Sequence, residues 1–149
     1  MLPADEELDE LYREVILEHY RSPRHKGELP EPTVTLERNN PVCGDVIRLH
    51  LLLDGERVKE ASFTGQGCSI SQASASMLME AIQGASFQEI DALYTAFKAL
   101  MYGAERPEAE LGDLEALEGV KKFPVRVKCA TLAWNILQEA LEGHGGEKG

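Results

Sequence analysis

The spacing of apolar residues changes once along this chain, and no other feature limits its fold as strongly. Residues 46–53 alternate, with isoleucine or leucine at every second position, which is the period of a strand that buries one face. After the Gly-Gln-Gly segment at 65–67, apolar and small residues recur every three or four positions through residues 70–82, which is the period of a helix. The sequence therefore predicts a sheet followed by helices.

The first of these regions predicts a small antiparallel sheet. The Asp-Gly pair at 54–55 is a strong tight-turn signal, so residues 57–64 can return beside residues 46–53 as a partner strand. The apolar positions of the returning segment fall out of strict alternation, which predicts a bulge near residues 59–60. A further strand is expected over residues 33–37, giving three strands in all.

Helices are predicted both before and after the sheet along the chain. A period of three and four, with acidic residues early, predicts a helix over about residues 5–21, followed by a connecting loop over 22–32. Beyond the sheet, the same period predicts helices over residues 70–82, 86–103 and 129–141. Ser86 and Glu89 resemble a capping box at the start of the second of these. The predicted fold is α+β, with an N-terminal helix, a three-stranded antiparallel sheet and a helical C-terminal half.

Length and charge narrow the class of protein. A chain of 149 residues with 43% hydrophobic and 28% charged residues fits one folded domain, residues 1–149. Within it, the polar segment 105–119 is expected to form a short helix at most, and residues 143–149 a flexible tail. The net charge of −11 would repel nucleic acids and anionic membranes, so neither is an expected partner. With no membrane-length apolar run and an acidic N-terminus, we expect a cytoplasmic protein.

The three cysteines point to metal binding or thiol chemistry, because an odd number fits a disulfide framework poorly. Cys43 and Asp45 lie two positions apart, and in extended backbone such residues share a face, so they can supply sulfur and oxygen to one ion. Cys68 directly precedes a predicted helix, where amide groups and the positive end of the helix favour its thiolate.

Cys129 completes a set of four ligands. It lies at the predicted start of the last helix, where the basic residues Arg126 and Lys128 favour a thiolate and are expected to offset the charge of the site. Three thiolates and Asp45 supply the four ligands of a tetrahedral zinc site. The alternative for any one cysteine is a buried packing role, which is common for free cysteines. Three cysteines beside glycine turns and helix starts favour the metal site.

The remaining polar residues of chemical interest are expected to have structural or solvated roles. Among them are the four histidines, His19, His25, His50 and His144. The serines at positions 69, 71, 74 and 76 have no His-Asp pair at useful spacing. Helix capping and close packing therefore explain their presence better than nucleophilic catalysis does. Tyr12 and Trp134 lie on helical stripes and are predicted to be core residues.

Four segments carry motifs that are long enough to be specific. They read Tyr-Arg-Ser-Pro-Arg-His at 20–25, Asn-Pro-Val-Cys-Gly-Asp at 40–45, Phe-Thr-Gly-Gln-Gly-Cys-Ser-Ile-Ser-Gln-Ala-Ser-Ala-Ser at 63–76 and Val-Lys-Cys-Ala-Thr-Leu-Ala-Trp at 127–134. In these segments the sequence resembles the U-type iron–sulfur cluster assembly family, the IscU and SufU proteins, over nearly the whole chain. The resemblance implies an α+β fold and a metal or cluster site formed by Cys43, Asp45, Cys68 and Cys129.

Departures from the IscU pattern make the chain more similar to SufU. IscU-like chains have a histidine before the third cysteine, where this sequence has Lys128. The interval from Cys68 to Cys129 is longer than in IscU, which indicates an insertion around residues 99–121. The segment 123–128 also departs from the Leu-Pro-Pro-Val-Lys motif of IscU, so a dedicated Hsp70-type chaperone is not an expected partner.

The resemblance to SufU implies a role in sulfur transfer. The protein would hold zinc at rest, accept persulfide sulfur from a cysteine desulfurase and pass it into iron–sulfur cluster assembly, as a zinc-dependent sulfurtransferase. Cys43, beside Gly44, is the expected acceptor and catalytic residue. Two alternatives stay open: a scaffold that holds iron or a transient 2Fe–2S cluster for client or carrier proteins, and a purely structural zinc site.

Overall fold

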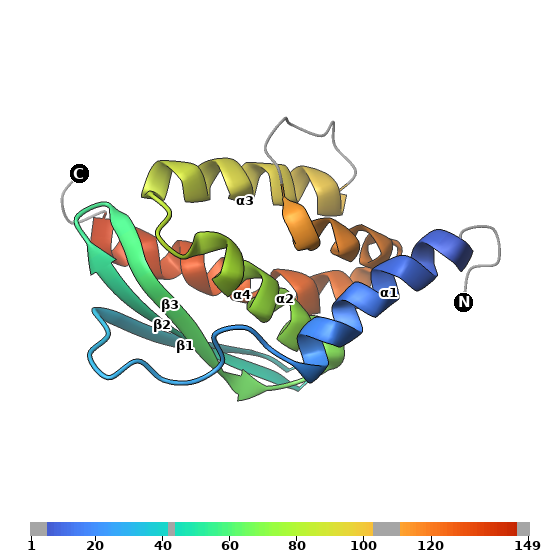
Figure 1. The fold of residues 1–149 in the computed structure, drawn as a ribbon, viewed down its shortest axis with the longest axis horizontal. Helices are drawn as coiled ribbons and strands as arrows, with labels where there is room; N and C mark the ends of the chain where they lie inside the picture. The colour runs from blue at the N-terminus through green and yellow to red at the C-terminus, as the bar shows by residue number, and fades with distance from the viewer. Residues whose placement is uncertain (1–5, 42–43, 103–110, 146–149) are drawn as a thin grey trace.

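The computed structural model describes residues 6–41, 44–102 and 111–145, and it confirms the predicted α+β order (Figure 1). The elements are α1 (Glu6–Arg21), β1 (Val34–Asn40), β2 (Asp45–Asp54), β3 (Arg57–Gln66), α2 (Ser69–Ile82), α3 (Phe87–Tyr102), the 3-10 helix η2 (Gly112–Lys122) and α4 (Pro124–Gly145). Within the described ranges, no helix combines the length and the apolar composition that crossing a bilayer requires.

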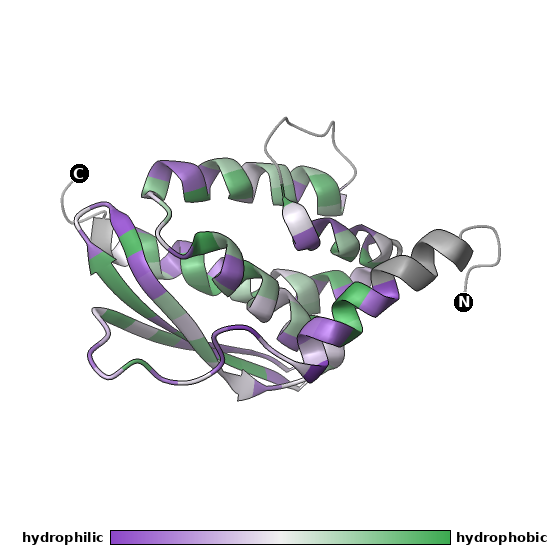
Figure 2. Ribbon diagram, in the orientation of Figure 1, coloured by the Kyte–Doolittle hydropathy of each residue, from purple (hydrophilic) through white to green (hydrophobic). Residues whose placement is uncertain are grey.

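The three strands form one antiparallel sheet in the order β1-β2-β3. Leu52 pairs with Glu60 and Leu53 pairs with Val58, so Lys59 is the extra residue of a bulge, as the broken alternation predicts. Figure 2 shows the alternation of apolar and polar residues along the strands. The register places Leu49 opposite both Leu36 and Phe63, so the middle of one face of the sheet is apolar.

The loop that follows α1 covers the outer edge of β3. Gly27 donates its N–H to the carbonyl of Phe63 at 2.8 Å, and Phe63 donates its own N–H to the carbonyl of His25 at 3.0 Å. These bonds satisfy backbone groups that an edge strand would otherwise expose. The loop therefore fixes the end of α1 against the sheet.

Helices α2 and α4 cover the apolar face of the sheet, and α3 packs beyond them (Figure 1). Trp134 of α4 is buried, as predicted, and stacks on Phe97 and Tyr94 of α3, with ring centroids 4.9 and 5.8 Å apart. The side chain of Tyr12, the other predicted core aromatic, lies outside the described part of the structure. The sheet side of the core contains Ile47, Leu49, Leu51, Val58 and Phe63.

The C-terminal helices differ most from the prediction. Helix α4 begins at Pro124 rather than at Cys129, with proline at a first position where its missing N–H costs nothing. It continues to Gly145, through the first residues of the segment predicted to be a tail. The described part of the acidic segment forms a 3-10 helix that extends to Lys122, further than the short helix expected within 105–119.

The predicted capping box at the start of α3 is confirmed. Ser86 donates its N–H to Oε1 of Glu89 at 2.8 Å, and Glu89 donates its N–H to Oγ of Ser86 at 3.1 Å. These hydrogen bonds hold the pKa of Glu89 below its usual range. The box gives α3 a fixed starting point immediately after the turn that ends α2.

A fully buried histidine joins three helices. The Nδ1 atom of His19 in α1 lies 2.7 Å from Oγ of Ser76 in α2, and its Nε2 atom lies 2.9 Å from Oδ2 of Asp113 in η2. Glu80 is the next carboxylate, 3.9 Å from the same nitrogen. Both ring nitrogens have partners within the protein, so we interpret this His19–Ser76–Asp113 cluster as a clamp that holds η2 to the first two helices.

Replacing Asp113 with alanine should lower the free energy of unfolding by about 1–3 kcal/mol, because it takes the carboxylate away from a buried ring nitrogen. Asp113→Asn keeps an acceptor at the same place and should cost less. Urea unfolding of the two variants measures both effects, with Asp91→Ala on the exposed side of α3 as the control. Equal stability of Asp113→Ala and Asp91→Ala would contradict the clamp.

Candidate metal centre

Asp45 is the first residue of β2 and is fully buried, although it carries a carboxylate. Its Oδ1 atom accepts a hydrogen bond from the backbone N–H of Cys68 at 2.9 Å. Its Oδ2 atom has no hydrogen-bond partner among the described residues. Burying a carboxylate oxygen without a partner raises the free energy of the folded state, and buried charges in proteins are usually paired or coordinate a metal ion. Asp45 therefore has the environment expected of a metal ligand.

Cys68 is the N-cap residue of α2, as the sequence predicts. Its backbone is extended, with φ −70° and ψ 168°, and its Sγ atom accepts a hydrogen bond from the N–H of Ser71 at 3.4 Å. An N-cap side chain normally supplies an oxygen for this purpose, so the sulfur here takes the place of a serine or aspartate oxygen. The half-buried thiol thus faces the amide groups at the positive end of the helix.

Two glycines before Cys68 allow the backbone to come close enough to β2. A Cβ atom on Gly65 would lie 2.0 Å from the carbonyl oxygen of Val46. A Cβ atom on Gly67 would lie 2.4 Å from Oδ1 of Asp45 and 2.6 Å from Oγ of Ser71. None of these distances is compatible with a side chain, so the contact between Asp45 and Cys68 requires glycine at both positions.

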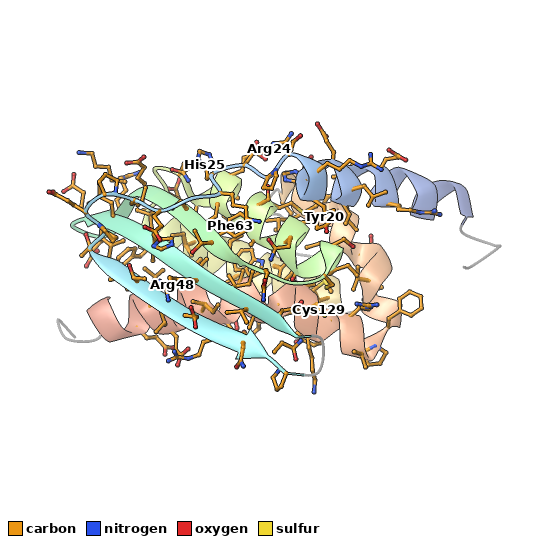
Figure 3. The ribbon with its side chains drawn as sticks, turned by 90° about the horizontal axis from the view of Figure 1, so that it is seen from below. Tyr20, Arg24, His25, Arg48, Phe63 and Cys129 are labelled. Carbon is orange, nitrogen blue, oxygen red and sulfur yellow. The ribbon has the colours of Figure 1, made fainter. Side chains whose placement is uncertain are left out.

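Cys129 is fully buried in the second turn of α4. The prediction that it starts a helix is wrong, because α4 begins at Pro124 and the positive end of a helix acts mainly within its first turn. Its Sγ atom contacts the carbonyl oxygen of Val125 at 3.7 Å and Nδ2 of Asn40 at 3.9 Å. Figure 3 shows Cys129 on α4 close to the end of the sheet.

The fold brings these three residues together from β2, the start of α2 and α4. One ligand atom from each of Asp45, Cys68 and Cys129 lies within 4.8 Å of the other two. Tetrahedral zinc holds two sulfurs about 3.8 Å apart, from zinc–sulfur bonds of about 2.3 Å. Small side-chain shifts would therefore complete the geometry, and the donor set of two thiolates and one carboxylate suits zinc. Cys43, the fourth predicted ligand, lies outside the described residues, two positions before Asp45.

The two basic residues predicted beside the site are both exposed on the first turns of α4. Residues three apart share a face of a helix and adjacent residues do not, so Arg126 is better oriented than Lys128 to act near Cys129. Their effect on the charge of the site stays a prediction.

The other polar residues considered in the sequence make structural contacts or are exposed, where the structure describes them. His50 is buried, its Nε2 atom lies 2.9 Å from Oγ1 of Thr64, and burial lowers its pKa, with Arg48 adding to the effect and Glu28 opposing it. His25 is exposed, and the side chain of His144 lies outside the described residues. The serines of α2 make capping and packing contacts, with Ser74 donating to the carbonyl of Ala130 at 2.6 Å.

Sequence reasoning did not single out the His19–Ser76–Asp113 cluster or the contact of Asn40 with Cys129. The members of each lie far apart in the chain, by 94 residues from His19 to Asp113 and by 89 residues from Asn40 to Cys129. Histidine, serine, aspartate and asparagine also have many ordinary roles at turns and surfaces. No local spacing in the sequence therefore predicts these contacts.

The fold is an α+β domain in which one aspartate and two cysteines converge at the end of the sheet, and these donor atoms could hold a metal ion. Residues 11–144 match the family described as the NifU-like N-terminal domain, and the chain belongs to this family. The match covers most of the chain as one unit, which confirms the resemblance drawn from the sequence motifs.

The relatives include proteins named SufU and proteins named IscU. The chain is 48% identical to the zinc-dependent sulfurtransferase SufU of Bacillus subtilis, over 93% of this chain and 95% of that protein. It is 44% identical to the iron–sulfur cluster assembly scaffold protein IscU of Streptococcus pyogenes, over 91% of this chain and 85% of that protein. The crystal structure of a protein named FiSufU from Fervidobacterium islandicum matches with a TM-score of 0.82 at 34% identity, over 86% of this chain and 94% of that chain.

Replacing Gly67 with alanine should weaken metal binding, because the new methyl group would push Asp45 away from Cys68. Overpacking of this kind costs about 1–3 kcal/mol, so stability should fall as well. Gly143→Ala is the matched control, because a Cβ atom at Gly143 has no neighbour within 4 Å. Zinc competition titrations and urea unfolding measure the two effects. Parent-like zinc affinity in Gly67→Ala would contradict the close approach.

Proposed function

We propose that the protein is a zinc-dependent sulfur acceptor that takes persulfide sulfur from a cysteine desulfurase and passes it into iron–sulfur cluster assembly. The observation that carries the proposal is the convergence of Asp45, Cys68 and Cys129, with one buried carboxylate oxygen that lacks a partner among the described residues. The identity to a protein named a zinc-dependent sulfurtransferase supports it.

In this proposal Cys43, Asp45, Cys68 and Cys129 hold one zinc ion. The ion would keep the thiols ionised and protect them from oxidation until a partner arrives. The protein contributes the geometry: Asp45 is held by the amide of Cys68, and Cys68 itself is held by the amide of Ser71. Arg126 and Lys128 are proposed to offset the negative charge that four anionic ligands leave on a divalent ion.

Cys43 is the proposed sulfur acceptor. It is followed by Gly44, an exposed residue with φ +73°, whereas Cys68 and Cys129 lie at and within helices. The thiolate of Cys43 would attack the outer sulfur of the partner's persulfide. A new S–S bond forms on Cys43, the partner's S–S bond breaks, and its electron pair leaves with the partner's cysteine as a thiolate. The exchange needs no external oxidant or reductant.

Cys43→Ser should abolish sulfur acceptance, because a serine oxygen cannot form the persulfide. The test incubates the protein with a cysteine desulfurase and cysteine, then alkylates and locates the added sulfur by mass spectrometry. Cys129→Ser is the comparison variant, and zinc content is measured for both. Full acceptance by Cys43→Ser together with none by Cys129→Ser would assign the acceptor role elsewhere.

Asp45→Ala should weaken zinc binding while Cys68→Ser weakens it more, because a carboxylate is the weaker ligand for a soft site. Loss of residues that only orient ligands already costs about 10–100-fold in affinity, so loss of the Asp45 ligand should cost at least tenfold or so. Competition titrations with a chromophoric chelator measure both variants. Parent-like zinc affinity and normal sulfur transfer by Asp45→Ala would remove Asp45 from the ligand set.

A second candidate function is a scaffold, favoured by the 44% identity to a protein named an assembly scaffold. The same four residues would hold a transient 2Fe–2S cluster and release it to client or carrier proteins. Anaerobic reconstitution with iron, cysteine and a desulfurase separates the two functions by absorption and Mössbauer spectra. A stoichiometric cluster that transfers to an apoprotein would support the scaffold.

A purely structural zinc site is the remaining alternative, and the rate of the desulfurase distinguishes it. A sulfur acceptor should raise the turnover of the desulfurase, because it removes the persulfide that blocks the next cycle. A structural zinc site would leave the rate unchanged, and removal of zinc would unfold the protein. Activation that depends on zinc and on Cys43 would therefore favour sulfur transfer.

A further inference from the structure

We propose that Asn40 is a positioning residue of the metal centre, which holds the sulfur of Cys129 in place by a hydrogen bond from its side-chain amide. This inference rests on the proposed function. Asn40 is the last residue of β1 and only 8% exposed, and its Nδ2 atom lies 3.9 Å from Sγ of Cys129. An N–H group of this kind is a suitable donor to a sulfur that carries negative charge.

The backbone of Asn40 also closes the turn between β1 and β2. Its carbonyl accepts the N–H of Gly44 at 2.8 Å, and Asn40 pairs with Asp45 across the two strands. The same residue thus contacts the turn through its main chain and α4 through its side chain. Through Asn40, the position of Cys129 is tied to the position of Asp45.

The contacts of the Cys129 sulfur with Val125 and Asn40 differ in chemical character. The carbonyl oxygen of Val125 can only accept, so this contact requires the proton of the thiol. The amide of Asn40 donates, so this contact remains favourable when the sulfur has no proton. Cysteine binds a metal as the thiolate, so of these two contacts only the one with Asn40 supports the metal-bound form of Cys129.

Cys68 has an equivalent donor in the backbone N–H of Ser71. Both described sulfurs of the centre therefore lie beside an N–H group of the protein. The donor to Cys68 belongs to the main chain, whereas the donor to Cys129 belongs to a side chain and can be removed by substitution. We infer that Asn40 keeps Cys129 on the metal while another ligand leaves.

Asn40→Asp is the sharpest test, because it keeps the shape of the side chain and replaces the donor with an acceptor. Zinc affinity should fall by about 10–100-fold, the usual cost of losing a residue that orients a metal ligand. Asn40→Ala, which removes the donor without adding charge, should cost less. Asn39→Asp is the matched control, because it adds the same charge one residue earlier on an exposed side chain.

The measurements are zinc competition titrations, the sulfur-to-cobalt charge-transfer band of Co²⁺-loaded protein, and urea unfolding. The expected result is weaker zinc binding and a shifted band for both Asn40 variants, with Asn39→Asp like the parent. If Asn40→Asp fails to fold, Asn40→Ala carries the test. Parent-like affinity and an unshifted band in folded Asn40 variants would overturn the proposal. If the parent protein itself binds neither ion, the proposed function fails too, which a direct titration of the parent reveals.

Discussion

Asp45 can lie against the start of α2 only because the backbone of residues 65–67 approaches β2 without side chains in between. A methyl group at Gly67 would overlap the carboxylate, and one at Gly65 would overlap the backbone of β2. The antiparallel register sets up this approach, since Gln66 at the end of β3 pairs with Val46 near the start of β2. The positions of the Asp45 carboxylate and the Cys68 sulfur thus depend on the sheet. The register of the sheet depends in turn on its buried apolar residues.

The position of the Cys129 sulfur depends on how α4 packs in the core. Cys129 lies in a helix whose next turn carries Trp134, and that ring is stacked on Phe97 of α3. Packing of large aromatic rings fixes a helix along its axis as well as around it. The His19–Ser76–Asp113 cluster similarly holds η2, which immediately precedes α4. The core therefore sets the distance from Cys129 to Asp45 and Cys68.

Under the proposed function, the ligands differ in how firmly the protein holds them. Asp45, Cys68 and Cys129 each have a contact with an N–H group of another residue. Cys43 precedes Gly44, which donates its N–H to the carbonyl of Asn40. Three ligands held in this way suit the exchange of a thiolate, because Cys43 can react while the other three keep the metal in place. A scaffold would use the same residues, so the fixed part of the centre serves either function.

The sequence alone determined the order of the elements, the bulge at Lys59, the capping box at Ser86 and the place of Cys68 before α2. Each of these follows from local rules, because side-chain period, turn residues and caps act over a few positions. The sequence motifs also predicted one site of Cys43, Asp45, Cys68 and Cys129, and the structure brings the last three together. The same local rules could have predicted the start of α4 at Pro124. The basic residues that follow Pro124 made the helical period of apolar residues hard to recognise.

Only the tertiary structure decided how deeply these groups are buried and what they touch. The burial of Cys129 in a second helical turn, the joining of His19 to Asp113, and the contact of Asn40 with Cys129 all link separate elements. Such contacts depend on how whole helices pack against the sheet. Packing is set by the summed shapes of many core side chains, and no local pattern in the sequence specifies it.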